Sequence, residues 1–141
     1  MGFYYHFHDH DLHITTEKLP EAGQLLREYE AAIVQNGYAP DVEQEDPKVP
    51  FIQQIADANR WSVQIDGNGA TISPPWNACK GDTYTGWLEW LAPVISDGGF
   101  IQISDDNDNV YRLMFFDGKC YQVPQTWPSK EQVVSQYEPR D

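Results

Sequence analysis

Basic residues are the scarcest chemistry in this chain. Only 9 of its 141 residues are Lys or Arg, whereas 22 are Asp or Glu, which gives a formal net charge of −13. The excess is not a terminal tail, because residues 1–60 hold 11 acids and 4 bases and residues 61–141 hold 11 acids and 5 bases. So strong a negative field repels nucleic acid and anionic membrane, and it steers positively charged partners toward the protein. The charge therefore excludes direct binding of nucleic acid or of a membrane surface and favours a basic partner.

Long apolar runs are also missing. No stretch approaches the roughly 18 apolar residues that span a bilayer, and no charged-then-apolar signal segment opens the chain. Cysteine is limited to Cys79 and Cys120, which lie far apart in the sequence and could either pair or remain free. We favour two semi-buried free thiols and expect a cytoplasmic protein.

Large side chains are plentiful by contrast. Aromatic residues make up 13% of the chain, with 5 Trp, 8 Tyr and 6 Phe, which is enough for one well-packed core. At this length we expect a single domain over residues 1–141. Within it we expect an acidic surface loop at 38–50 and a flexible C-terminus at 138–141.

The hydrophobic periodicity changes from helical spacing in the first half to alternation in the second. The Asp66–Gly69 segment and Asp117-Gly118 are typical hairpin turns. The predicted helices cover 20–35, 50–59, 83–95 and a short segment from Ser129. The predicted strands cover 3–13, 61–65, 70–73, 100–104, 110–116 and 119–123. This order is typical of an α+β domain, with a mainly antiparallel sheet of about five or six strands and about two to four helices packed on one face.

All 4 histidines lie between His6 and His13. On a regular strand, His6, His8 and His10 project from the same face about 7 Å apart, a spacing at which imidazoles can converge on a divalent metal such as zinc. That interpretation implies a metal-dependent small-ligand binding protein or enzyme. The alternative is a solvent-facing strand face that carries polar rings, with no cofactor.

Two acidic clusters lie on segments that we expect to be exposed connections. Prolines surround the first cluster and strand-like runs flank the second, so both are predicted to be surface loops or turns. The second begins like a calcium loop, but Val110 and Phe116 stand where such a loop needs Gly and Glu. The acids that we expect to contact a partner are Asp41, Glu43, Glu45 and Asp46 in the first cluster and Asp105, Asp106 and Asp108 in the second.

Tryptophan supplies the candidate anchors. Trp76 follows two prolines and Trp127 precedes one, so both are expected on irregular backbone. Exposed indoles there would anchor a protein interface, although they could instead plug the ends of the core. Trp87 and Trp90 lie one helical turn apart and are expected in the core.

No catalytic set is recognisable, and we expect a protein that is not an enzyme. A compact acidic domain of this size is similar, by class rather than by motif, to bacterial immunity proteins and to phage-encoded anti-restriction and anti-CRISPR proteins. The resemblance implies an acidic interaction protein that inhibits a toxin nuclease or a nucleic-acid-binding effector. Its carboxylates would take the place of nucleic-acid phosphates against Lys and Arg of the partner.

Overall fold

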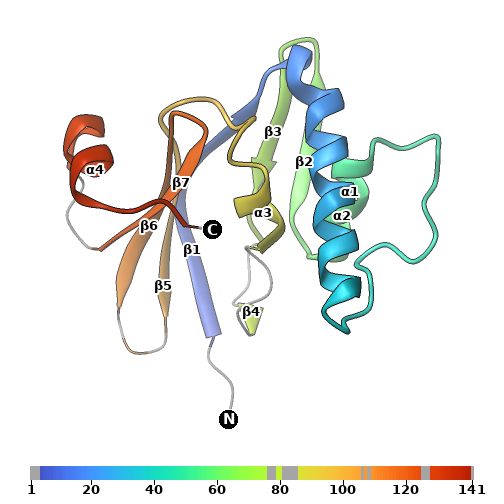
Figure 1. Cartoon of the computed structure of the whole chain (residues 1–141), viewed down its shortest axis with the longest axis horizontal. Helices are drawn as coiled ribbons and strands as arrows, with labels where there is room; N and C mark the ends of the chain where they lie inside the picture. The colour runs from blue at the N-terminus through green and yellow to red at the C-terminus, as the bar shows by residue number, and fades with distance from the viewer. Residues whose placement is uncertain are drawn as a thin grey trace.

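A single antiparallel sheet organises the protein (Figure 1). The computed structural model describes residues 4–75, 79–80, 86–105, 107, 109–124 and 128–140, with the backbone alone at 4, 5, 79 and 80. Six strands follow one another across the sheet in the order β2-β3-β1-β5-β6-β7, and the short β4 pairs with β1 off that path. The strands are β1 (Tyr4–Ile14), β2 (Ser62–Asp66), β3 (Gly69–Ser73), β4 (Cys79–Lys80), β5 (Gly99–Asp105), β6 (Val110–Phe116) and β7 (Lys119–Pro124).

The helices surround this sheet and confirm the predicted α+β class. They are the 3-10 helix η1 (Thr16–Lys18) and the α-helices α1 (Leu19–Gln35), α2 (Phe51–Ala58), α3 (Gly86–Trp90) and α4 (Lys130–Gln136). None of the helices within these described ranges is both long enough and apolar enough to cross a membrane.

Helix α1 begins and ends where its sequence predicts. Pro20 stands in the first turn, where its missing N–H leaves no helical hydrogen bond unmade. Past the end of the helix, Gly37 adopts a φ of +91°, a left-handed backbone that favours glycine. Between these points, residues at helical spacing are buried on one face of α1, among them Ala22, Leu26 and Tyr29.

Helix α3 is shorter than predicted. It spans Gly86–Trp90, and the chain then continues in tight turns in which Ala92 and Val94 donate to the carbonyls of Glu89 and Leu91. Pro93 has no N–H to donate, so a regular helix is not sustained to residue 95. The predicted start of this helix, at residues 83–85, lies outside the described residues.

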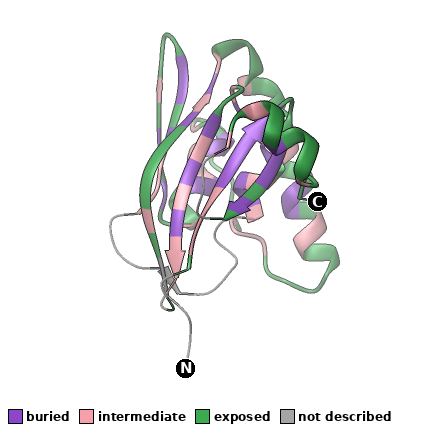
Figure 2. Cartoon of the chain, turned by 90° about the vertical axis from the view of Figure 1, so that its left-hand side faces the viewer, coloured by how far each residue is buried: buried purple, intermediate pink, exposed green. Residues whose placement is uncertain are grey.

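The sheet has a core on each face. The larger core lies between the sheet and helices α1, α2 and α3, and it includes Leu113 and Phe115 of β6. The alternate residues Met114 and Phe116 join a smaller core with Val133 of α4, because successive side chains of a strand point to opposite faces. Figure 2 views the molecule from the side of α4. The outer surface of α4 is largely exposed, and the strands carry buried residues. Three helices thus cover one face of the sheet and α4 covers part of the other.

The C-terminal segment is tied to the sheet. The Arg140 N–H donates to the Cys120 carbonyl at 2.7 Å, and its guanidinium donates to Glu89 of α3 and Gln122 of β7. In the C-terminal segment expected to be flexible, Arg140 therefore contacts β7 and α3, and Asp141 lies outside the described residues. Cys120 itself is a buried free thiol, whose pKa is raised by burial.

Candidate partner-binding surface

The first acidic cluster belongs to a loop that is fastened to the helices. Residues 38–50 lie beside α1 and α2 at one end of the long axis of the molecule (Figure 1). Asp41 is half-buried, and its Oδ2 accepts hydrogen bonds from the Tyr29 hydroxyl at 2.9 Å and from Asn59 Nδ2 at 3.0 Å. Burial, and then this bond to Asp41, raise the pKa of Tyr29. Asp41 therefore joins α1, the loop and the C-terminal end of α2.

The other acids of this loop differ in the hydrogen bonds that they make. Glu45 accepts two hydrogen bonds from the Arg27 guanidinium, at 2.6 and 2.5 Å, and Arg27 also lies over the Phe51 ring. Asp46 exchanges hydrogen bonds with Gln54 through its backbone, and its Oδ1 accepts from the backbone N–H of Lys48. Glu43 is exposed. Three of the four predicted contact acids thus hold the loop in place, and Glu43 presents its charge to solvent.

A buried carboxylate lies beneath this loop. Glu30 on α1 is only 8% exposed, and it accepts a hydrogen bond from the backbone N–H of Val42. Burial, followed by the nearby charges of Asp41 and Glu45, raises the pKa of Glu30. Glu30 was not among the residues predicted from the sequence. The signal that could have identified it is its position on the buried face of α1, one residue after Tyr29 and four after Leu26.

Glu30 predicts a specific pH dependence of stability. The pKa of Glu30 in the folded state lies above its ordinary value of 4.5. Its contribution to the free energy of unfolding is therefore complete at low pH and is lost as the pH rises through the folded pKa. A Glu30→Gln variant stays neutral, so its free energy of unfolding should increase relative to the wild type between about pH 4 and about pH 7. Urea denaturation across this range, with Glu28→Gln on the exposed side of α1 as the control, measures the difference. A constant or decreasing difference would contradict the account.

Asp105, the member of the second acidic cluster that the structure describes, lies far from the first cluster. Asp105 ends β5, and its carboxylate accepts hydrogen bonds from the backbone N–H groups of Asn107 and Asn109 and from the Asn109 side chain. These bonds, the Asn109 side chain first, lower the pKa of Asp105. Asp106 and Asp108 lie outside the described residues. The C-terminal end of β5, where Asp105 lies, is at the opposite side of the molecule from the 38–50 loop (Figure 1), so Asp105 and the first cluster do not form one continuous surface.

The structure does not bring the three candidate metal ligands together. In the pairing of β1 with β5, Phe7 lies opposite Ile103 but His10 lies opposite Ile101, so β1 contains one extra residue between them. This bulge changes the alternation of faces. His6 is paired with Ser104, whereas His10 is paired with the core residue Ile101 and therefore belongs to the other face. The expectation of one shared face is wrong, and the described residues contain no group of three His, Cys, Asp or Glu that could hold a metal ion.

Three of the histidine rings instead form hydrogen bonds with a hydroxyl or a backbone carbonyl. His8 Nε2 lies 2.7 Å from the Ser104 hydroxyl. His10 Nδ1 lies 3.2 Å from the His8 carbonyl, and His13 Nε2 lies 3.0 Å from the Asn68 carbonyl. Since a carbonyl only accepts, both of these ring nitrogens carry a proton. His6, His8 and His10 are exposed, as the alternative to a metal site expected, but His6 and His10 do not share one face of β1.

The tryptophans are distributed differently from the sequence prediction. Trp76 and Trp127, the predicted anchors, lie outside the described residues. Trp87 is fully buried, as expected, but Trp90 is 39% exposed, so its assignment to the core is wrong. The Trp90 and Tyr29 rings are in edge-to-face contact with centroids 6.2 Å apart, and part of the indole remains open to solvent.

Several of the few basic residues are used to join elements of the fold. Arg27 links α1 to the 38–50 loop. Lys130 links α4 to the segment before β5 and to the β6–β7 turn. Arg140 links the C-terminal segment to α3. The ion pairs are Arg27–Glu45, Lys130–Asp97, Lys130–Asp117 and Arg140–Glu89. Cations held in this way are less available to a partner, and the surrounding acids dominate the surface.

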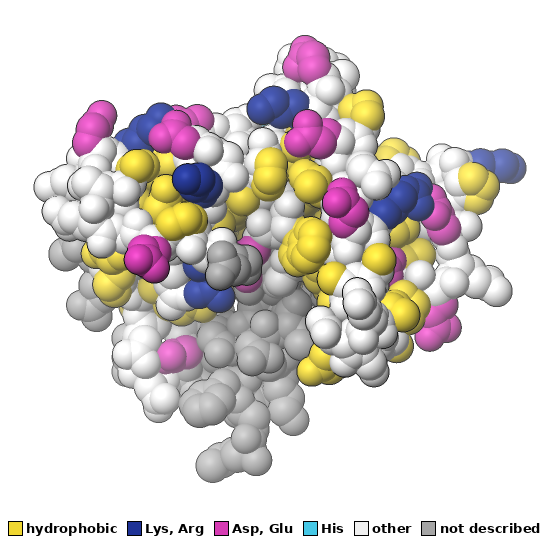
Figure 3. Space-filling view, in the orientation of Figure 1, with side chains coloured by type: hydrophobic (Ala, Val, Ile, Leu, Met, Phe, Trp, Pro, Cys, Tyr) yellow, Lys and Arg dark blue, Asp and Glu magenta, His cyan; other side chains and the backbone are white. Residues whose placement is uncertain are grey.

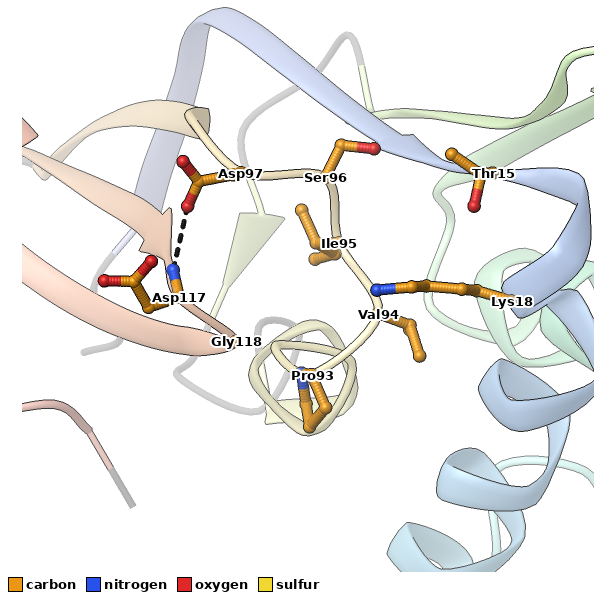
Figure 4. A pocket seen from close by; sticks show the side chains of 9 residues that line it. All are labelled: Thr15, Lys18, Pro93, Val94, Ile95, Ser96, Asp97, Asp117 and Gly118. Atoms are coloured by element: carbon orange, nitrogen blue, oxygen red, sulfur yellow. Dashed lines mark hydrogen bonds between the residues drawn. The ribbon is translucent and has the colours of Figure 1, made fainter.

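A pocket of about 410 Å³ lies between η1, the segment that follows α3, and the β6–β7 turn. Figure 4 shows Lys18 extending along one side and Asp97 and Asp117 on the other. Both carboxylates are bound to Lys130, at 2.9 and 3.0 Å. The backbone N–H of Asp117, and then Lys130, lower the pKa of Asp97. With Lys18 and Lys130 balancing the two acids, this pocket has no excess charge with which to select an ion.

One face combines exposed apolar groups with acids. Figure 3 shows hydrophobic side chains gathered between α1 and the β6–β7 region, with acidic side chains on the α1 side of them.

Comparisons of the chain with protein-family models, with curated proteins and with solved structures found no match.

Proposed function

We propose that this protein binds a basic surface of a partner protein and blocks it by occupying it. The observation that supports the proposal is the distribution of its negative charge. Exposed carboxylates are present on strands, on helices and on connections, on both sides of the sheet. They include Asp11, Glu21, Glu28, Glu43, Asp57, Asp66, Glu131 and Glu138.

Such a field acts mainly on the rate and specificity of association. Complementary charge accelerates the encounter of two proteins and penalises partners of the same sign. With a net charge of −13, the chain suits a partner whose own function requires a Lys- and Arg-rich surface. A toxin nuclease or a nucleic-acid-binding effector of the cytoplasm has such a surface, and an acidic protein seated on it would exclude the nucleic acid.

The test is a pull-down at low and high salt, with variants chosen so that the fold is unaffected. The four exposed residues Glu21, Glu28, Glu43 and Glu131 are changed together to Gln, which takes the net charge from −13 to −9. The same four changed to Asp form the matched control, because their charge is retained. Asp41, Glu45 and Asp105 are left unchanged because they hold loops in place.

We expect the wild type and the Asp control to capture a basic protein at low salt and to release it at high salt. The Gln variant should capture less of it, and the captured protein should lose its nucleic-acid binding when the wild type is bound. Capture that is equal at both salt concentrations and equal in the Gln variant would contradict the proposal.

A further inference from the structure

The exposed part of Trp90 lies at the junction of α3 with α1. Tyr29 of α1 makes an edge-to-face contact with the indole, and Gly86, at the start of α3, is so near to Tyr29 that an added Cβ would lie 3.7 Å from its ring. Leu25, one helical turn before Tyr29 on α1, is half-buried against the same core. Pro93, three residues after Trp90, is exposed. We call the accessible apolar part of this junction the Trp90 surface: Leu25, Trp90 and Pro93, with the buried Tyr29 supporting the indole.

Uncompensated acids lie beside these apolar residues. Glu21 and Glu28 precede and follow Leu25 by four and three residues, a spacing that places side chains next to one another on a helix. Both are exposed, and no ion pair within the described residues involves either of them. Figure 3 shows acidic side chains along the α1 side of the hydrophobic group on this face. The surface therefore offers an open indole next to unneutralised carboxylates.

We infer that the Trp90 surface is where the basic partner docks, and that an arginine of the partner lies on the indole of Trp90 while Glu21 and Glu28 bind its charge. This inference rests on the proposed function and locates it. Arginine fits this combination better than lysine, because its planar guanidinium stacks on an aromatic face and forms forked hydrogen bonds with a carboxylate. Tryptophan and arginine are also the residues most enriched where interfaces concentrate their binding energy.

The experiment titrates the protein with a short arginine homopeptide and with a lysine homopeptide of equal length, at low salt. The wild type should prefer the arginine peptide, and among the indole N–H signals in the NMR spectrum that of Trp90 should shift most. Trp90→Ala should weaken arginine-peptide binding by about fivefold and remove the preference over lysine. Tyr38→Ala is the matched control, since Tyr38 is a 68% exposed aromatic beyond the end of α1, and it should bind like the wild type.

The outcomes separate this inference from the proposed function. Salt-sensitive binding of both peptides with no effect of Trp90→Ala and no shift of its indole would overturn the Trp90 surface and leave the acidic binding function standing. No binding of either peptide would overturn both. Self-association of the wild type that Trp90→Ala abolishes would instead assign the surface to a second copy of this chain and overturn the inference. The indole shift is measured on the wild type, so the test does not depend on the stability of the variant.

Discussion

Replacing Trp61 with alanine is expected to lower the free energy of unfolding by about 3–5 kcal/mol, the largest effect that we predict for a single substitution. Trp61 is 2% exposed and lies between two other rings. Its centroid is 5.0 Å from that of Phe7 on β1 and 5.5 Å from that of Trp87 on α3, in edge-to-face contacts. The substitution would leave a cavity where β1, β2 and α3 meet. Since domains of this kind are stable by about 5–15 kcal/mol, a large share of the total would be lost.

Trp61→Phe provides the matched control. It keeps an aromatic ring between Phe7 and Trp87 and removes the indole N–H, which is buried and has no hydrogen-bond partner among the described residues. The loss of volume is thus offset in part by relief of an unsatisfied donor. Urea denaturation followed by circular dichroism should show a much smaller loss for Trp61→Phe than for Trp61→Ala. Equal losses of unfolding free energy in the two variants, or a loss below about 1 kcal/mol for alanine, would contradict a major role of this ring cluster in the stability of the core.

Replacing Asp41 with alanine is expected to cost about 1–3 kcal/mol, the second largest effect. One carboxylate oxygen accepts from both the Tyr29 hydroxyl and the Asn59 amide, so its removal leaves two donors without this acceptor. Tyr29 is only 6% exposed, and its hydroxyl has little access to water as a substitute. The loop at 38–50 should therefore loosen from α1 and α2.

Two further variants isolate this contact. Glu43→Ala, at an exposed position of the same loop, should change stability by no more than about 0.5 kcal/mol. Tyr29→Phe should be less costly in the Asp41→Ala background than in the wild type, because the hydrogen bond that it removes is already absent. Additive effects of Tyr29→Phe and Asp41→Ala in the double variant would mean that the two residues are not coupled.

Local sequence signals were sufficient for most of the fold. Asp117-Gly118 adopts the positive φ values, +53° and +77°, that a two-residue hairpin requires. Ser129 and Gln132, three residues apart, form a capping box, which begins α4 at the expected place. In both cases the structure is decided by residues within a few positions of each other, so it can be predicted from sequence.

The site depended on contacts between distant segments, which local patterns do not report. The bulge that moves His10 to the other face is set by the register of β1 against β5, about ninety residues away. Trp90 lies on the short α3, where it contacts Tyr29 of α1, and it remains partly exposed. The acids of the 38–50 loop were recognisable as a cluster, but their pairing with Arg27, Tyr29 and Asn59 required the packing of two helices.

The most direct test of the central claim is the rate constant of association with the captured basic partner, measured by stopped-flow mixing between about 0.05 M and about 0.5 M salt. If the dispersed carboxylates steer the partner, the rate constant will fall steeply with salt for the wild type. It will fall less steeply when Glu21, Glu28, Glu43 and Glu131 are all Gln, and as steeply as in the wild type when all four are Asp. A rate constant that is independent of salt, or equal salt dependence in the Gln variant and the wild type, would contradict the account.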